Sequence, residues 1–185
     1  MPTRGRNNLT EESIFFVTTT VVRFLRVFSN PAICDILIAN LKYYQTVYKY
    51  EILAYVIMPS HFHWIVAIEP HLGTISDIMR DIKRSTSKEI ISYLKSNSQY
   101  MDIFSKEAEQ YPKQERKFWM RRFDDEVIRN DRMFWQKVGY IHNNPVKAGL
   151  VEVSSNYKYS SAGNYISGDN SIIEVNTSFG GVQLL

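Results

Sequence analysis

The fold of this chain is set by residues 52–68, which run ILAYVIMPSHFHWIVAI. The continuous apolar run over residues 52–58 predicts a buried strand, and residues 63–68 predict a second strand. Pro59 and Ser60 interrupt the two runs, as turn residues do. So short a connection predicts an antiparallel hairpin, with His61 and His63 at the end nearest the turn.

The two histidines of this hairpin can act together. Side chains two residues apart in a strand point to the same face, so both imidazoles can reach one metal ion. The same pair is also common at an ordinary polar strand end. A structural zinc site is disfavoured, because Cys34 is the single cysteine and such sites take four nitrogen or sulfur ligands. If an amide oxygen joined the two imidazoles as a third ligand, coordination positions of the metal ion would remain open. Such a ligand set suits Mg²⁺ or Mn²⁺.

Further elements surround the hairpin. Strands are also predicted within residues 14–27 and 123–128, and helices at residues 32–48, 74–94 and 131–143. Residues 95–117 are polar and predict an irregular, flexible connection. The order β-α-β-β-α-(β)-α predicts an α+β fold with a mostly antiparallel sheet, close to a ferredoxin-like arrangement. Residues 1–166 are expected to form one domain, and residues 167–185 a tail that the core does not need.

Composition limits the class of protein. A chain of 185 residues with 44% hydrophobic and 14% aromatic content can bury a substantial core and is not disordered. A lone cysteine cannot form an internal disulfide, and no stretch resembles a secretory signal or an apolar membrane span. The expected location is therefore the reducing cytoplasm.

Positive charge gathers in two stretches, although the net charge is only +3. Aromatic residues are interleaved with the second stretch. Cations can follow phosphates while rings stack on bases, so this pattern suits single-stranded nucleic acid. A solvated helix face with buried aromatics would give the same pattern. The expected DNA contacts in these stretches are Arg80, Lys83, Arg84, Arg116, Lys117, Arg121 and Arg122.

The last predicted helix supplies a second set of candidate site residues. Tyr140 and Asn144 are four residues apart and share a face of the helix, away from the apolar line through Val138. Lys137 lies on the same polar line and would favour a phenolate at Tyr140. Each residue also has an ordinary role, Tyr140 at the rim of the core and Asn144 as the helix end before Pro145. Two imidazoles, an amide and a phenol that converge would equip a metal-assisted enzyme with a tyrosine nucleophile.

These motifs resemble those of a known family. Residues 58–64, MPSHFHW, are similar to the histidine–hydrophobic–histidine (HUH) motif of single-tyrosine transposases. Residues 140–151, YIHNNPVKAGLV, resemble the signature of one branch, the REP-associated tyrosine transposases. Residues 119–129 and 157–162 also resemble segments of that branch, so the resemblance covers roughly residues 12–166. Asp124 and Ser60 depart from the residues that the family often has at these positions.

The resemblance implies a fold and an activity. The fold would be the ferredoxin-like HUH domain, and the enzyme would cut single-stranded DNA beside hairpins and rejoin it through a 5′-phosphotyrosine. His61 and His63 would hold a divalent metal ion, Tyr140 would be the nucleophile, and Asn144 would be the third ligand. DNA contacts on this helix are expected at Lys137, His142 and Lys147.

Two other functions fit the same residues. A domesticated relative could bind structured single-stranded DNA without transposing, and an unrelated metal hydrolase could use the histidine pair with water as its nucleophile. DNA with hairpins is the expected partner, and a monomer is expected rather than a homodimer.

Overall fold

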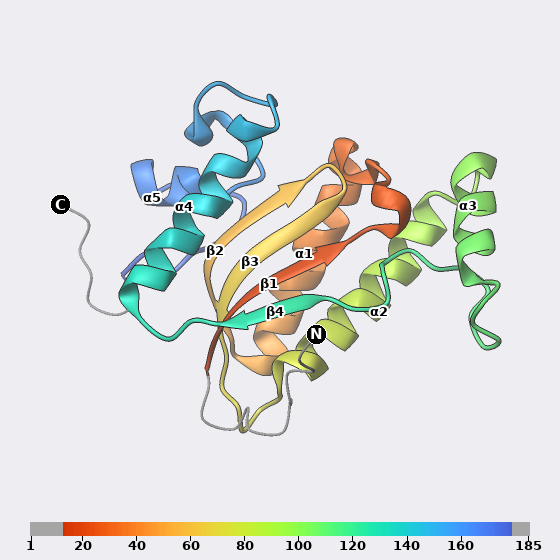
Figure 1. Ribbon diagram of the computed structural model, residues 1–185, viewed down its shortest axis with the longest axis horizontal. Coiled ribbons are helices and arrows are strands. Elements are labelled where there is room, and N and C mark those ends of the chain that lie inside the picture. The colour runs from red at the N-terminus through yellow and green to blue at the C-terminus, as the bar shows by residue number, and fades with distance from the viewer. Residues whose placement is uncertain (1–12, 179–185) are drawn as a thin grey trace.

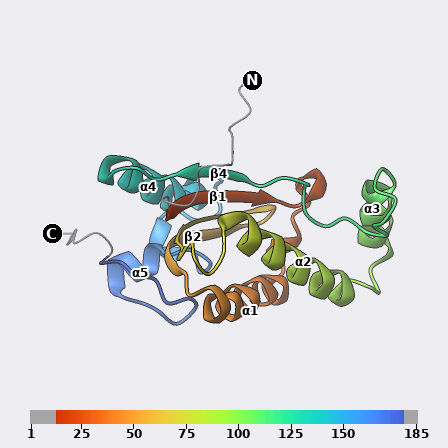
Figure 2. The same cartoon turned by 90° about the horizontal axis from the view of Figure 1, so that it is seen from below.

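The computed structural model describes residues 13–178, in which helices pack on both faces of a four-stranded antiparallel sheet. The strands are β1 (Ile14–Thr20), β2 (Glu51–Met58), β3 (His61–Ala67) and β4 (Asp124–Val127). The helices are α1 (Pro31–Tyr48), α2 (Ile75–Tyr93), α3 (Ser98–Ala108), α4 (Asp131–Lys147) and α5 (Ala162–Ser167). Figures 1 and 2 show α1 and α2 on one face of the sheet and α4 on the other.

The sheet has the order β2-β3-β1-β4, and all neighbouring strands are antiparallel. Together with the chain order β1-α1-β2-β3-α2-β4, this is the ferredoxin-like arrangement, so the predicted fold class is confirmed. Met58 pairs with His61, which leaves only Pro59 and Ser60 in the hairpin turn. Both histidines therefore lie within β3, although the sequence pattern predicts a strand that starts at His63.

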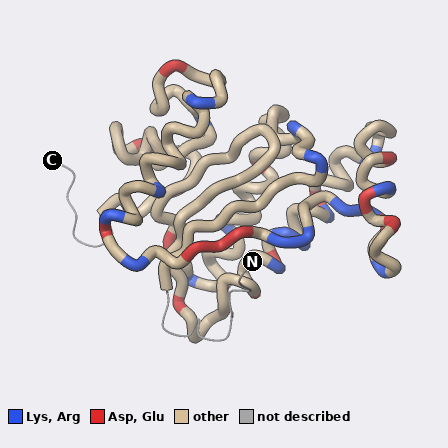
Figure 3. Tube along the Cα trace, viewed as in Figure 1, with Lys and Arg blue, Asp and Glu red and all other residues tan. Residues whose placement is uncertain are grey.

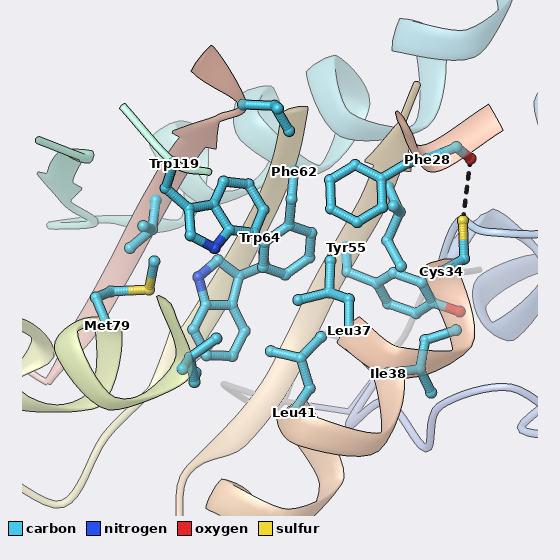
Figure 4. Packing of buried hydrophobic residues seen from close by; sticks show 14 of the residues in the cluster. Phe28, Cys34, Leu37, Ile38, Leu41, Tyr55, Phe62, Trp64, Met79 and Trp119 are labelled. Carbon is cyan, nitrogen blue, oxygen red and sulfur yellow. Dashed lines mark hydrogen bonds between the residues drawn. The ribbon is translucent and has the colours of Figure 1, made fainter. Parts of the chain in front are cut away.

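Alternation along the strands divides the core between the two faces of the sheet. Phe62 and Trp64 point toward α1 and α2, where they pack with Leu37 and Leu41 (Figure 4). Ile65 points to the opposite face. There it joins a second apolar cluster, which α4 supplies with Phe134, Val138 and Ile141. This second cluster seats α4 on β2 and β3, next to the histidines.

Helix α4 is longer than predicted, because Pro145 lies inside it and does not end it. A proline in the last turn removes one hydrogen bond, and the following residues still close the helix. Gly149 has a φ of +68°, its N–H donates to Val146 O, and Leu150 N–H donates to Pro145 O. These two bonds form a Schellman motif, so the glycine is the stop signal. Asn144 is therefore within the helix and not at its end.

Three further segments differ from the predictions. Residues 95–117 contain helix α3, which Asn97 caps through Tyr100 N and which buries Met101 and Phe104. Strand β1 ends at Thr20 and is followed by the 3-10 turns Val22–Phe24 and Val27–Ser29. A tail outside the core is expected from residue 167, but Ile173 and Val175 are buried in the main core. Among residues 13–178, no helix is both long and apolar enough to cross a membrane.

Candidate active site

His61 and His63 lie on the face of β3 that α4 partly covers. Their ring centroids are 4.7 Å apart. In the antiparallel ladder, Thr20 pairs with His61 and Thr18 pairs with His63, so β1 lies next to both histidines. The prediction that the two imidazoles share one face is confirmed.

The His63 ring is held on both sides. Its Nδ1 is 2.8 Å from Thr18 Oγ1, and Phe16 stacks on it with a centroid distance of 5.7 Å. Its Nε2 is buried and has no hydrogen-bond partner among residues 13–178. Burial, with smaller contributions from His61 and Lys137, lowers the pKa of His63 to about 3. The ring is therefore neutral at pH 7, which is the form that binds a metal.

His61, like His63, has a hydroxyl group next to its Nδ1 atom, which here comes from Ser60. Its Nδ1 is 3.1 Å from Ser60 Oγ, and burial lowers its pKa. Two neutral imidazoles, each with one nitrogen next to a hydroxyl, match the way metal-binding histidines are oriented by outer partners. The buried and unpaired His63 Nε2 is the observation that fits a metal ion best. Among the described residues, no three His, Cys, Asp or Glu side chains are placed to hold one metal ion together, so a third protein ligand beside the two histidines would be of another type.

Tyr140 projects from the middle of α4 toward this pair. Tyr140 is 42% exposed, and the centroid of its ring is 5.2 Å from that of His63 and 5.9 Å from that of Phe16. The apolar seat of α4 therefore brings an accessible phenol beside the histidines. Tyr140 and the two histidines are thus brought together although His63 and Tyr140 are far apart in the sequence.

Lys137 occupies the preceding turn of α4, but its charge is already paired. Its Nζ is 2.5 Å from Glu126 Oε2 on β4 and lies 4.5 Å from the centre of the Phe16 ring. It links α4 to the edge strand across the site. Its expected help in ionising Tyr140 stays a prediction.

Asn144 and His142 follow on the same helix with different surroundings. Asn144 is half-buried one turn beyond Tyr140, and it forms no hydrogen bond with either histidine in the described part of the chain. His142 Nε2 is 2.8 Å from Ser161 Oγ and its ring packs against Tyr165, while burial lowers its pKa to about 4. These contacts pack His142 against α5, and its expected DNA contact stays a prediction.

The basic residues of α2 have partners of their own. Arg80 pairs with Asp77 at 2.6 Å and with Asp81 at 3.1 Å, and Arg84 lies 3.4 Å from Asp81. These three contacts leave much of the helix face neutral. The phosphate contact expected of Arg80 stays a prediction.

The remaining basic residues fall into two groups. Lys83, Arg84, Arg116, Lys117 and Arg121 line a cavity between α2 and the segment that leads into β4. Arg122 and Lys147 are exposed and do not line that cavity. The two basic stretches of the sequence are thus joined in one place, which neither stretch could show alone.

Thr18 and Phe16 are site residues that the sequence reasoning missed. Both face His63 from β1, one through a hydrogen bond and the other through its ring. Alternate residues of a strand share a face, so residues 16, 18 and 20 belong together. Their relation to the histidines depends on the register of β1 against β3, which no local signal gives.

Comparisons with known proteins identify the family of this chain and similar proteins. The family model described as "Transposase IS200 like" matches residues 14–144, a range that includes both histidines, Tyr140 and Asn144. A Haemophilus influenzae protein assigned as a REP-associated tyrosine transposase is 33% identical over 119 residues. That match spans 62% of this chain and 60% of the relative. The solved structure of a REP-associated tyrosine transposase bound to a REP hairpin aligns with a TM-score of 0.68 and 21% identity, covering 100% of this chain and 99% of that one.

Proposed function

Because this chain belongs to the IS200-like transposase family, we propose that it cuts and rejoins single-stranded DNA beside hairpins through a covalent bond to Tyr140. One observation carries the proposal. An accessible phenol lies 5.2 Å, ring to ring, from the imidazole of His63, whose buried Nε2 has no hydrogen-bond partner within the described part of the chain. A nucleophile beside a vacant metal-ligand atom suits transfer of a phosphate ester.

A divalent ion, Mg²⁺ or Mn²⁺, fits the donor set of the site. His61, His63 and Asn144 would hold it, and when bound it would polarise the scissile phosphate and neutralise developing charge. Thr18 and Ser60 orient the two imidazoles through their Nδ1 atoms. Asn144 is the residue that can add an oxygen ligand from the same helix as the nucleophile.

The chain's own residues account for strand transfer. Tyr140 Oη attacks phosphorus, loses its proton, and becomes a 5′-phosphotyrosine, while the bond to the 3′ oxygen breaks and that oxygen takes up a proton. No water is consumed, so the phosphodiester is conserved as an ester. A 3′-OH of another strand then attacks the phosphotyrosine, and Tyr140 recovers its proton. A tyrosine nucleophile therefore permits rejoining, which hydrolysis by water would not.

The proposed substrate is single-stranded DNA that contains hairpins. The structural neighbour that matches this fold was solved with a REP hairpin, and the basic residues of this chain supply the charge that such a ligand needs. We propose that the protein acts as a monomer, with both histidines and the tyrosine supplied by one chain. Transposition as the cellular outcome rests on the same family assignment.

Formation of a covalent adduct tests the proposal. Wild-type protein incubated with hairpin-bearing single-stranded DNA and Mn²⁺ should give a protein–DNA adduct that survives denaturing electrophoresis. Tyr140→Phe should form none, because the variant lacks only the attacking oxygen. Tyr43→Phe is the matched control, since Tyr43 is also exposed but lies on α1, across the sheet. An adduct with Tyr140→Phe would show that another residue is the nucleophile, and binding without any adduct would favour a DNA-binding protein that does not cleave.

A further inference from the structure

A cavity of about 520 Å³ lies beside α2, away from the histidines. One wall is α2 and the other is the connection from α3 to β4, and Figure 3 shows blue segments gathered where these two pass each other. No acidic side chain lines this cavity. The basic residues that line it are Lys83, Arg84, Lys88, Arg116, Lys117 and Arg121.

Several of these charges are held close together without compensation. Lys117 is only 8% exposed, and its Nζ is 3.1 Å from Tyr111 Oη, which is a neutral partner. Lys83 Nζ donates to Met120 O at 2.8 Å, a carbonyl and not a carboxylate. Arg116 Nε is buried and has no acceptor within residues 13–178. Arg84 is the member of the group with an acidic partner, Asp81.

Burial and a neighbouring like charge both disfavour the charged form of a lysine. Burial lowers the pKa of Lys83 to about 8, and the charge of Lys117 adds to the effect. Two cations that remain so close are costly in the free protein. An anion placed between them would remove the repulsion and supply an acceptor for Arg116.

The walls of the cavity are also suited to a base. Tyr111 forms one side and is fixed by Lys117, whose Nζ is 4.4 Å from the centre of its ring. Trp119 also borders the cavity and is anchored by a 3.0 Å hydrogen bond from Nε1 to Thr86 Oγ1, but it is only 4% exposed, so Tyr111 is the ring on which a base can stack. Fixed aromatic surfaces next to cations are the usual receptors for single-stranded nucleic acid. The volume lies in the range of cavities that take small ligands, so one nucleotide can be accommodated.

The position relative to the active site completes the case. Met120 N–H donates to Thr20 O at 2.8 Å, and Thr20 pairs with His61 in the sheet. Two strand spacings therefore separate the cavity wall from His61, which is about 10 Å. The cavity and the catalytic face are therefore close enough for one DNA strand to contact both.

We propose that this cavity binds one nucleotide of the single strand that flanks the hairpin, with its phosphate between Lys83, Arg116 and Lys117 and the phosphates on either side of it next to Lys88 and Arg121. The inference rests on the proposed function for the identity of the DNA. It adds a second anchor that holds the flank while Tyr140 acts on the scissile phosphate. Free phosphate or a mononucleotide would satisfy the same chemistry, so the experiment separates these ligands from the DNA strand.

The test measures DNA affinity with and without the flank. In a Tyr140→Phe background, which cannot cleave, Lys88→Ala/Arg121→Ala removes two exposed charges of the cavity. Three fluorescent hairpins would be used, one blunt, one with a 5′ flank and one with a 3′ flank, each over a salt series. The loss of two phosphate contacts should lower the log–log salt slope for one flanked hairpin by about 1.4. If the variant and the parent protein bind equally at 1 M salt, this change in slope lowers the affinity of the variant for that flanked hairpin about tenfold at 0.15 M salt. The blunt hairpin should bind as before.

Controls make each outcome decisive. Lys42→Ala/Lys106→Ala removes two exposed charges outside the cavity and should leave both flanked hairpins unchanged. Equal losses on blunt and flanked hairpins, or no loss on either flanked one, would overturn the proposal. If inorganic phosphate or dAMP stabilises wild-type protein but not the cavity variant, while flanked affinity is unchanged, the cavity binds free anions and the DNA assignment fails. The adduct assay is separate, so a missing adduct would refute cleavage without touching the cavity.

The protonation of Lys83 gives a second readout. A phosphate next to Lys83 favours its charged form, so binding should take up a proton where the free side chain is neutral, above pH 8. Affinity for the flanked hairpin should therefore fall as pH rises from 8 toward 10, by up to about tenfold per pH unit, and Lys83→Met should flatten this dependence. The other ionisable groups around the cavity are Arg84, Lys88, Tyr111, Arg116, Lys117 and Arg121. An unchanged pH profile in Lys83→Met would remove Lys83 from the phosphate site.

Discussion

Thr18→Val tests whether the hydrogen bond behind His63 prepares the site for a metal ion. The hydroxyl of Thr18 is 2.8 Å from His63 Nδ1, and valine keeps the branched shape and the strand preference while removing that oxygen. His63 is only 4% exposed, so water cannot easily replace the lost partner. The ring would lose the contact that fixes its orientation and tautomer.

The magnitude follows from what still holds the ring. Loss of an outer partner usually costs 10- to 100-fold in metal affinity. Phe16 remains stacked on the His63 ring at an interplanar angle of 16°, so the plane of the ring is kept while its tautomer is not. We therefore expect the lower end, about tenfold weaker Mn²⁺ binding. The free energy of unfolding should fall by about 1 kcal/mol, the usual net value of one hydrogen bond.

Calorimetric titration with Mn²⁺ measures the first effect, and chemical denaturation measures the second. Thr20→Val is the matched control, because Thr20 lies on the same face of β1 but His61 Nδ1 is held by Ser60. An Mn²⁺ affinity equal to wild type in Thr18→Val would refute the orienting role. An equal loss in both variants would show that the effect comes from the strand and not from the hydrogen bond.

The remaining predictions concern the ligands and the helix end. His61→Ala and His63→Ala should each abolish Mn²⁺ binding and adduct formation, whereas Asn144→Ala should be milder, because water can replace an amide oxygen; wild-type titration curves for either histidine variant would contradict the ligand assignment. Gly149→Ala should destabilise the protein by about 1 kcal/mol, because its φ of +68° strains an L-residue. Gly139→Ala, in the helix interior with no atom within 4 Å of an added Cβ, should instead be neutral or stabilising by thermal melting.

The parts of the fold that the sequence predicted are those with local causes. The helix predicted over residues 74–94 begins where Thr74 and Asp77 form a capping box, with Thr74 Oγ1 accepting from Asp77 N at 3.2 Å. The β2–β3 hairpin was predictable because two apolar runs are separated by a proline and a serine. In both cases the residues that determine the structure lie within a few positions of one another.

The parts that were missed depend on contacts between distant segments. Pro145 has the local signature of a helix end, yet it is buried within α4, and the Schellman motif at Gly149 ends the helix instead. The hydrogen bond of Thr18 to His63 needs the register of β1 against β3, 45 residues away. From the sequence, each basic stretch could be a solvated surface or a DNA-binding segment. The packing of α2 against residues 116–121 brings residues of both stretches into the lining of one cavity.

The packing of α4 on the sheet explains how Tyr140 and the proposed metal ligands are held next to each other. Tyr140 is exposed and makes ring contacts with His63 and Phe16, but Ile141 beside it is fully buried and Val138 lies beneath the helix. The position of the phenol is thus set by apolar side chains that take no part in the chemistry. The histidines are set by a strand between two others in an antiparallel sheet, which is equally rigid. Since the two elements meet through one shared cluster, the distance from phenol to imidazole depends on core packing more than on any polar contact within the site.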